Sequence, residues 1–498
     1  MDTWMHEQRS TIILVCVGLY MLMCIGVGFW ALRQTKTSKD FFMAGHRLGI
    51  FVTGVAVFSS TMSGFGFVGG PGLVYRMGVS SLWMVICTPI SFCLSHYLLA
   101  KRLRLFAAVR GTISLPDAVA SRYDNRASGF LSALAILLGV MGYLGTQILA
   151  MAHVLRSLLL DFEGLRFMSL EWCVAVSCAV LVFYCTTGGI IASVYTDLVQ
   201  GFVMMIAAIL VFFAAINAID GGFYGMANTI VKHDPEAIGP WGTLGIFGCL
   251  SWFFVFTLGA SGQPHVVTKM MMYKNLRDAK HLLPISVFGY AICALLWISI
   301  GLVMRALVIQ GVHSPLANAD EAAPQFLQHY AHPLLAGIVF AGLMAAIMST
   351  ADSFLNIGAA AIVHDIPRAL RGRSLSNELA WARTATVVIA VAASFFALKA
   401  GKLVALLGAF GWGTFAAALV PAVAIGFNWK RATALAANVA IATSLIVNFS
   451  LELFGVRIPF GIDKGAAALL ISLTLFFTLS LAAPPKPIAR DIETAMDV

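Results

Sequence analysis

Residues 59–72 read SSTMSGFGFVGGPG and lie inside an apolar segment, residues 48–75, that is long enough to cross a lipid bilayer. Serine, threonine, glycine and proline crowd this stretch, although an uninterrupted helix facing lipid would avoid them. Such residues leave backbone carbonyls and hydroxyls unbonded at membrane depth, which is tolerated only where protein or a water-filled cavity receives them. The stretch therefore predicts a broken transmembrane helix whose break holds an ion and faces a solute.

Composition places the whole chain in a membrane. Its 498 residues are 60% hydrophobic and 11% charged, whereas soluble domains carry about 25% charged residues. One crossing needs about 20 apolar residues, and about 13 such segments are present. We expect one all-α integral membrane domain over residues 1–498, with these segments at residues 11–32, 48–75, 80–100, 127–155, 172–188, 190–216, 243–262, 282–308, 333–362, 384–398, 403–427, 432–451 and 465–483.

The positive charge follows the loops. The net charge is +9, and alternate loops hold most of the 32 Lys and Arg residues. Basic loops remain in the cytoplasm, so the N-terminus is expected outside and the C-terminus inside a cell (inner) membrane. The bilayer, rather than nucleic acid, is the expected partner of these charges. The basic segments are residues 33–47, 101–126, 269–280, 368–383, 430–431 and the tail at 484–498.

A second span is also interrupted. The seventh span reads FGCLSWFFVFTLGASGQPH, in which Gly259, Gly262 and Pro264 loosen the helix. A pair of interrupted spans in two halves of a chain indicates a transporter site between them. Residues 48–216 and 243–427 are then two five-helix repeats, inverted because five is odd. A short turn, CTTGG, is expected between spans five and six. Residues 11–32 and 432–483 are peripheral helices, and 484–498 form a cytoplasmic tail.

Two acidic residues fall within the spans, Asp197 and Asp352. Each costs roughly 2.5–3.5 kcal/mol to insert at mid-helix, which makes each a functional candidate. Asp197 could instead lie near enough to the cytoplasm to be hydrated. Asp352 lies among hydroxyls, although Ser349 and Thr350 could simply bond back to their own helix. No catalytic motif occurs in a fitting context, so neither an enzyme nor an organic cofactor is expected.

The chain resembles the sodium:solute symporter family over about residues 11–485. The stretch FFMAGHRLGIFVTGVAVFSSTMSGFGFVGGPGLVYRMG is similar to its second-helix signature, and YCTTGGIIASVYTDLVQ, GQPH and MSTADS match in order. SSTMSG resembles the proline/sodium symporters, and GFVGGPGLVYRMG the pantothenate/sodium symporters. The resemblance implies 13 spans with the inverted repeat of the leucine-transporter type.

The resemblance also implies sites. A sodium ion would bind between spans two and nine, at the carbonyls of Ser59, Met62 and Ala346 and the hydroxyls of Ser349 and Thr350. A second cation site would use Asp197, Asp352 and Ser353. Thr61 replaces an aspartate of the proline symporters, and Phe256 and Ala260 replace their Trp and Tyr. The solute is expected at Ser63, Gly64, Phe65 and Gln147, across from Trp252, Phe253 and Phe256.

These residues predict Na⁺-coupled symport of a small amino acid or carboxylate by alternating access, with Na⁺ as the coupling ion. Two alternatives remain open. Asp352 could carry a proton in place of Na⁺, which would make the chain a proton-coupled symporter. The same fold could also serve as a membrane solute sensor, although the C-terminal tail is short.

Overall fold

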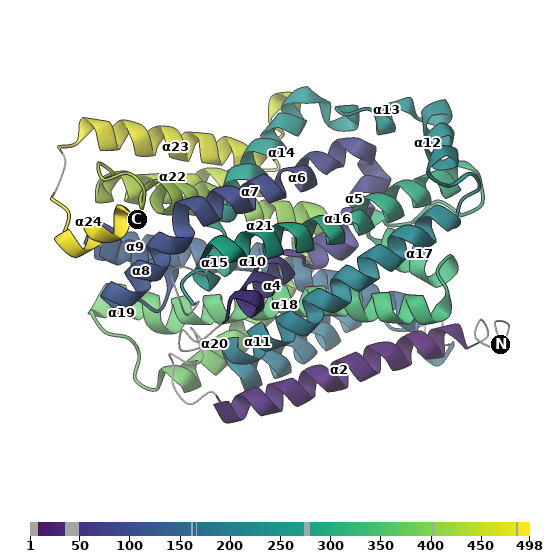
Figure 1. Cartoon of the computed structure of the whole chain (residues 1–498), viewed down its shortest axis with the longest axis horizontal. Helices are drawn as coiled ribbons and strands as arrows, with labels where there is room; N and C mark the ends of the chain where they lie inside the picture. Colours follow the sequence, from purple (N-terminus) through teal and green to yellow (C-terminus); the bar gives the residue numbers. More distant parts are fainter. Residues whose placement is uncertain are drawn as a thin grey trace.

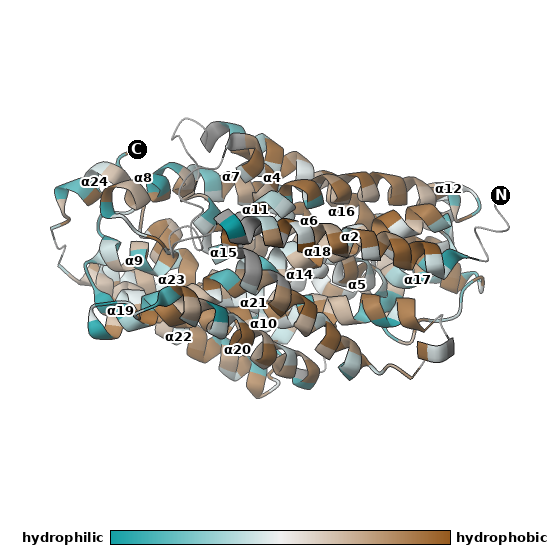
Figure 2. Ribbon diagram, turned by 90° about the horizontal axis from the view of Figure 1, so that it is seen from below, coloured by the Kyte–Doolittle hydropathy of each residue, from teal (hydrophilic) through white to brown (hydrophobic). Residues whose placement is uncertain are grey.

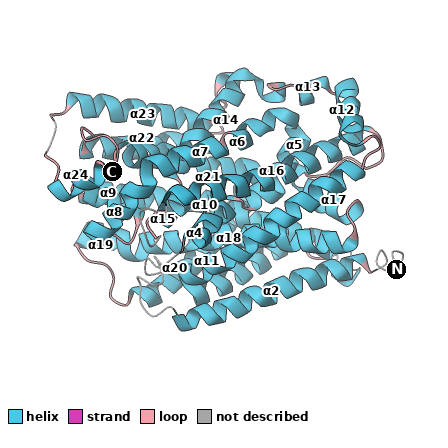
Figure 3. Cartoon of the chain, viewed as in Figure 1, coloured by secondary structure: helices cyan, strands magenta, loops and turns pink. Residues whose placement is uncertain are grey.

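The computed structural model describes residues 8–34, 49–160, 163–165, 167–272, 279–400, 403–484 and 487–498. Within these ranges the chain is helical and contains no strand (Figure 3). Eleven described helical segments are long and apolar enough to cross a membrane, and Phe51–Thr61 and Leu170–Phe183 are shorter apolar helices. Each apolar segment expected from the sequence overlaps one of these helices.

The main helices and their bounds are α2 (Arg9–Gln34), α4 (Ile50–Thr61), η2 (Phe65–Gly69), α5 (Gly70–Met77), α6 (Trp83–Ile86), α7 (Thr88–Ser95), α8 (Lys101–Arg110), α9 (Leu115–Tyr123), α10 (Arg126–Leu159), α11 (Leu170–Asn217), α12 (Gly222–His233), α13 (Pro235–Ile238), α14 (Gly245–Gly259), α15 (Pro264–Lys269), α16 (Ala279–Ile309), α17 (Ala322–His329), α18 (Pro333–Ala360), η10 (Ala361–Asp365), α19 (Ile366–Arg371), α20 (Glu378–Ala400), α21 (Val404–Leu419), η11 (Val420–Ile425), α22 (Ala434–Leu453), α23 (Lys464–Ala482) and α24 (Arg490–Met496).

The helices run side by side along the long axis of the molecule. α8, α9, α19 and α24 lie within the segments that hold most of the Lys and Arg residues, and they gather at one end, which we call the basic end; α12 and α13 lie at the other (Figure 1). Apolar ribbon fills the middle of the bundle and hydrophilic ribbon collects toward its ends (Figure 2). This banding is what a bilayer around the middle requires.

The second span is broken, as its sequence predicts. α4 ends at Thr61, Met62 has an extended backbone (φ −79°, ψ 96°), and the chain resumes as the π-helix η2 and then α5. The hydroxyls of Ser60 and Thr61 bond back to the carbonyls of Ala56 and Val57, both at 2.8 Å. These bonds compete with the helix at its last turn, so the break falls directly after them.

The seventh span is broken too. α14 ends at Gly259, a short 3₁₀ turn covers Ala260–Gly262, and Gln263 is extended (φ −75°, ψ 111°) before α15 begins. Ser91 of α7 accepts a hydrogen bond from the Ala260 amide at 3.2 Å. The Ser91 hydroxyl therefore satisfies a backbone N–H group at the break, as irregular backbone at membrane depth requires.

The two broken spans run in opposite directions. At one end, Thr243, just before α14, donates to the carbonyl of Met77, the last residue of α5, at 3.4 Å. At the other, the Lys269 ammonium, the last residue of α15, donates to the carbonyl of Ala56 in α4 at 3.1 Å. The end of one span thus meets the start of the other at both ends. This antiparallel pairing supports the inverted repeat, whose residue bounds stay predictions.

The residues expected to form a turn between spans five and six are assigned as helix instead. Residues 185–189 are assigned as helix within α11, although the apolar parts on either side, Leu170–Phe183 and Ser193–Asn217, are two separate apolar helices. Glycine is more frequent in transmembrane helices than in soluble ones, and Gly alone does not end a helix there.

Candidate functional site

Two hydroxyls of α18 face the break in the second span. Ser349 Oγ donates to the carbonyl of Ser59 at 3.2 Å, and Thr350 Oγ1 donates to that of Ser60 at 2.9 Å. Both hydroxyls also lie within 3.2 Å of the Ala346 carbonyl. The structure therefore brings together four of the five residues predicted for the sodium site, all of them buried.

The fifth predicted residue lies at the break itself, and one unpredicted residue joins the group. Met62 is fully buried at the break, and its amide donates to the Phe58 carbonyl at 2.8 Å. Ser60 was not predicted, yet its carbonyl is the partner of Thr350. The motif alone does not specify which of two successive carbonyls at the end of α4 accepts the bond from Thr350. We call Ser59, Ser60, Ala346, Ser349 and Thr350 the hydroxyl–carbonyl cluster.

A buried ion pair lies beside this cluster. Lys269 Nζ is 2.8 Å from Asp197 Oδ2, and the two side chains are 2% and 0% exposed. The same ammonium donates to the Ala56 carbonyl. Asp197 is therefore paired rather than hydrated, and Lys269, which the sequence places at the start of a basic loop, is buried between three helices. The sequence analysis did not predict Lys269, although an acid within a span requires such a partner and this requirement could have pointed to it.

Asp352 stands apart from that pair. It is 1% exposed, and its Oδ2 has no hydrogen-bond partner among the described residues. Its polar neighbours include Ser193, Cys185 and Asp197. Ser353 donates to the Ser349 carbonyl of its own helix at 3.1 Å. The predicted second cation site thus contains one acid that is paired by Lys269 and one that is not.

The other side of the break is built around Gly64. Its amide donates to Gln147 Oε1 at 2.8 Å, and the Phe65 amide donates to Ser63 Oγ at 3.1 Å. A Cβ on Gly64 would lie 2.6 Å from Ala150 and 3.1 Å from Gln147 Oε1. Only glycine allows α10 to approach this closely, so Gln147 can reach the backbone at the break.

Aromatic rings wall this position. Phe65 stacks on Phe256 with centroids 6.1 Å apart and meets the edge of Trp297 at 5.5 Å. Phe256 stacks in turn on Trp412 at 5.2 Å. Phe253 instead packs its ring against Trp83 at 6.0 Å. Trp297 and Trp412 were not predicted, because nothing in the sequence brings α16 and α21 to the break.

Several buried polar groups near these rings lack partners. Tyr143 Oη, Gln263 Oε1 and both ring nitrogens of His265 have no hydrogen-bond partner among the described residues. The Tyr143 and His265 rings lie 6.0 Å apart, and Phe354 packs on both, at 4.7 and 4.5 Å. Buried polar groups without partners are costly, which is consistent with a place where water, an ion or a solute binds.

A comparison with known families decides what this arrangement is. A family model described as the sodium:solute symporter family matches residues 41–443. The chain belongs to the sodium:solute symporter family. The resemblance that the motifs indicated is thereby confirmed.

Relatives of this symporter match over most of their length. The sodium/proline symporter of Escherichia coli (strain K12) is 30% identical over 451 residues, which is 88% of each chain. The osmoregulated proline transporter OpuE of Bacillus subtilis (strain 168) is 28% identical over 452 residues, or 87% of this chain and 88% of that one.

Solved structures confirm the fold class. A Na⁺-coupled sialic acid symporter, solved in a substrate-bound outward-open state, superposes with a TM-score of 0.77 at 21% identity, covering 96% of this chain and 99% of that one. MhsT in complex with L-phenylalanine gives 0.55 at 11% identity, covering 88% and 99%. The symporter is an all-α membrane protein of the leucine-transporter type. It is a multi-pass membrane protein that couples Na⁺ to solute transport by alternating access, and it is not an enzyme.

Proposed function

We propose that this symporter binds its coupling Na⁺ in the hydroxyl–carbonyl cluster between α4 and α18, with Met62 at its edge. The observation that supports this proposal is the convergence of Ser349 and Thr350 on the carbonyls of Ser59 and Ser60. Hard cations prefer oxygen ligands, and all groups in the cluster are neutral oxygens. An ion there would replace the hydroxyl-to-carbonyl hydrogen bonds that join the two helices.

The solute is proposed to be small, with a carboxylate and an apolar body, as in an amino acid. The Gly64 amide, now held by Gln147, offers a backbone donor to a carboxylate. Stacked rings of Phe65 and Phe256 offer an apolar wall. The relatives named above transport proline, but Thr61, Phe256 and Ala260 differ from the proline symporters at three positions. We therefore propose the solute class and not proline itself.

The basic end is proposed to face the cytoplasm. α8, α9, α19 and α24 lie together there (Figure 1), and the positive-inside rule assigns such loops to the cytoplasm. The C-terminal helix α24 would then be cytoplasmic, and the start of α2 would lie outside.

Proton coupling through Asp352 is the second candidate. The unpartnered Oδ2 of this buried acid favours it, because a buried carboxyl with one oxygen left unpaired is cheaper to keep protonated than charged. In that case Asp352 would carry the coupling ion and the hydroxyl–carbonyl cluster would be structural.

Uptake into proteoliposomes tests these alternatives. Loss of one ligand in Ser349→Ala or Thr350→Ala should raise the Na⁺ concentration for half-maximal uptake by about tenfold, since a hydrogen bond or ligand of this kind is worth roughly 1 kcal/mol or more. Ser444→Ala is the control, because its buried hydroxyl bonds back to Ile441 on the peripheral α22. A panel of labelled amino acids and short carboxylates identifies the solute.

If Ser349→Ala and Thr350→Ala both keep the wild-type Na⁺ dependence, the hydroxyl–carbonyl cluster is not the Na⁺ site. Uptake driven by a pH gradient without Na⁺, and abolished in Asp352→Asn, would establish proton coupling instead.

A further inference from the structure

Two cavities at the basic end share two lining residues. The outer cavity has a volume of about 930 Å³ and is lined by the exposed Arg110 and Arg126. The inner cavity has a volume of about 20 Å³ and is lined almost entirely by buried side chains. Asp365 and Pro116 line both cavities. A single side-chain layer therefore separates the surface from the interior at this point.

The inner cavity leads toward the proposed cation sites. Ser353, Lys269 and His265 line it. Ser353 donates to the carbonyl of Ser349, a member of the hydroxyl–carbonyl cluster, and both ring nitrogens of the fully buried His265 lack hydrogen-bond partners in the described part of the chain. A volume of this size holds about one water molecule. The walls thus offer polar groups to a water or an ion in transit.

A hydrogen bond between two elements closes the layer at Asp365. Ser114 precedes α9, where its hydroxyl accepts from the Asp117 amide at 3.1 Å, and the same hydroxyl donates to Asp365 Oδ1 of η10. Ser114 lines only the inner cavity, whereas Asp365 lines both. Breaking the hydrogen bond between Ser114 and Asp365 is the smallest change that would join the inner and outer cavities.

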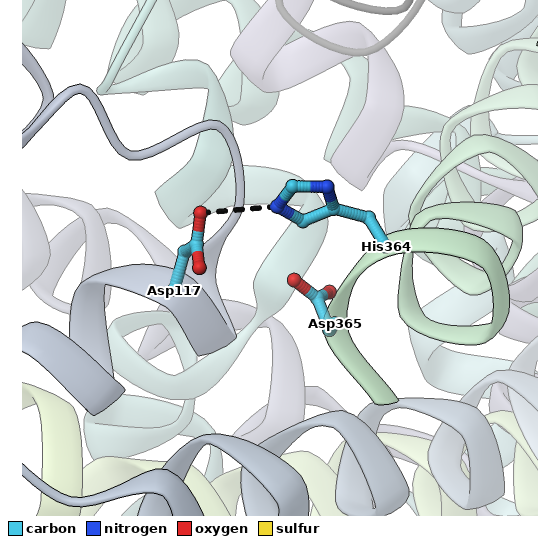
Figure 4. A group of neighbouring side chains, drawn as sticks. All are labelled: Asp117, His364 and Asp365. Atoms are coloured by element: carbon cyan, nitrogen blue, oxygen red, sulfur yellow. Dashed lines mark hydrogen bonds and ion pairs between the residues drawn. The ribbon is translucent and has the colours of Figure 1, made fainter. Parts of the chain in front are cut away.

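Charged side chains around Asp365 hold α9 against η10. Asp117, His364 and Asp365 face one another (Figure 4). His364 Nε2 lies 3.2 Å from Asp117 and its Nδ1 lies 2.9 Å from Glu378, while Arg368 donates to Asp117 at 2.7 Å. Arg368 neutralises the Asp117 carboxylate, as a bound metal ion otherwise would.

We propose that the inner cavity is the release route of the coupling cation toward the basic end, and that the contact of Ser114 with Asp365 is its gate. The route rests on the proposed sodium site, since it starts one helical turn from Ser349. α9 and η10 must separate for the cation to leave, and the ion pairs of Asp117 set how often they do. Asp365 and Ser114 are gating residues and do not bind the solute.

Accessibility of the inner cavity tests the gate. Ala360→Cys places a thiol in the wall of the inner cavity alone. Reaction with a membrane-impermeant maleimide, added from the side of the C-terminus, should be about tenfold faster when Asp365→Ala is also present, because a hydrogen bond to a charged group is worth about this factor. Asp365→Ala leaves the Ser114 cap on α9 intact, and Asp365→Asn serves as a second, milder variant.

Thr433→Ala is the matched control. Thr433 also caps a helix, α22, and lines the outer cavity, but it does not line the inner one. Labelling that is unchanged in both Asp365 variants, or raised equally in Thr433→Ala, would overturn the gate. The Na⁺ dependence of Ser349→Ala is measured separately, so a failed gate and a failed sodium site give different results.

Discussion

Lys269 carries the most unusual environment of any side chain at the site. Its ammonium and the Asp197 carboxylate are almost fully buried 2.8 Å apart. Removing one partner from such a pair leaves an uncompensated buried charge and costs about 3–5 kcal/mol, whereas replacing both can be nearly neutral. Lys269→Met and Asp197→Asn should each lower the melting temperature in detergent strongly, and the double variant should regain most of the loss.

The matched control for this prediction is Lys430→Met, because Lys430 and Glu493 are 45% and 47% exposed. Exposed pairs contribute about 0–1 kcal/mol, so this variant should leave the melting temperature almost unchanged. A double variant as unstable as the sum of the singles would contradict the direct pairing of Lys269 with Asp197.

The sequence indicated Asp197 as a functional candidate but gave no sign that Lys269 is its partner. Asp197 and Asp352 stand out because acids are rare within apolar spans. Ser349 and Thr350 stand out beside Asp352 in the sequence. Lys269 does not, since it is followed by further basic residues and so has the pattern of a loop. Its burial follows from the break before α15, which returns the chain to the bundle interior.

At the scale of elements, η9 (Ala319–Glu321) fastens α21 at the end opposite the basic end. Asp320 Oδ2 accepts from the Val404 amide at the start of α21 at 2.8 Å. Burial is the main cause that raises the pKa of Asp320 to about 7; nearby Glu321 adds to this effect, and the Val404 amide and Arg76 oppose it.

This raised pKa predicts a pH dependence of stability. Between about pH 4 and pH 7, folded Asp320 keeps a proton that the unfolded chain has released. Folding stability should therefore fall as the pH rises through this interval, by up to about 4 kcal/mol, and level off above it. Asp320→Asn retains an acceptor for Val404 and should flatten the melting temperature between pH 4.5 and 7.5. An equal slope in the variant would assign the pH dependence to another group.

The sequence predicted the two helices that break, but it was harder to predict from sequence which glycine-containing helices continue. Both breaks fall within clusters of Ser, Gly and Pro, whose hydroxyls and missing side chains weaken the helical ladder locally. The expected turn before Ser193 also rested on glycines, yet α11 continues through it. Glycine permits a break without requiring one, so the outcome depends on packing against neighbouring helices. The aromatic contacts of Phe65 with Trp297 and Trp412 with Phe256 depend on the same long-range packing.

At the scale of the whole molecule, the start of α2 and the C-terminal α24 lie at opposite ends of the bundle (Figure 1). This arrangement requires an odd number of crossings, as the apolar segments predict. The exposed Ser376 lies beyond α19 at the basic end, and the exposed Ser314 follows α16. Gln310, at the end of α16, donates to Thr229 of α12 at 2.9 Å, which places Ser314 at the other end.

Two serine-to-cysteine substitutions test the orientation of the molecule. An impermeant maleimide should label Ser314→Cys in intact cells and Ser376→Cys only after the membrane is permeabilised, if the basic end faces the cytoplasm as proposed from the positive-inside rule. The unsubstituted symporter measures the background from its nine native cysteines. The reverse pattern would invert the proposed orientation while leaving the fold intact. Labelling of both positions from one side would contradict the fold itself, because these positions lie at opposite ends of the same helical bundle.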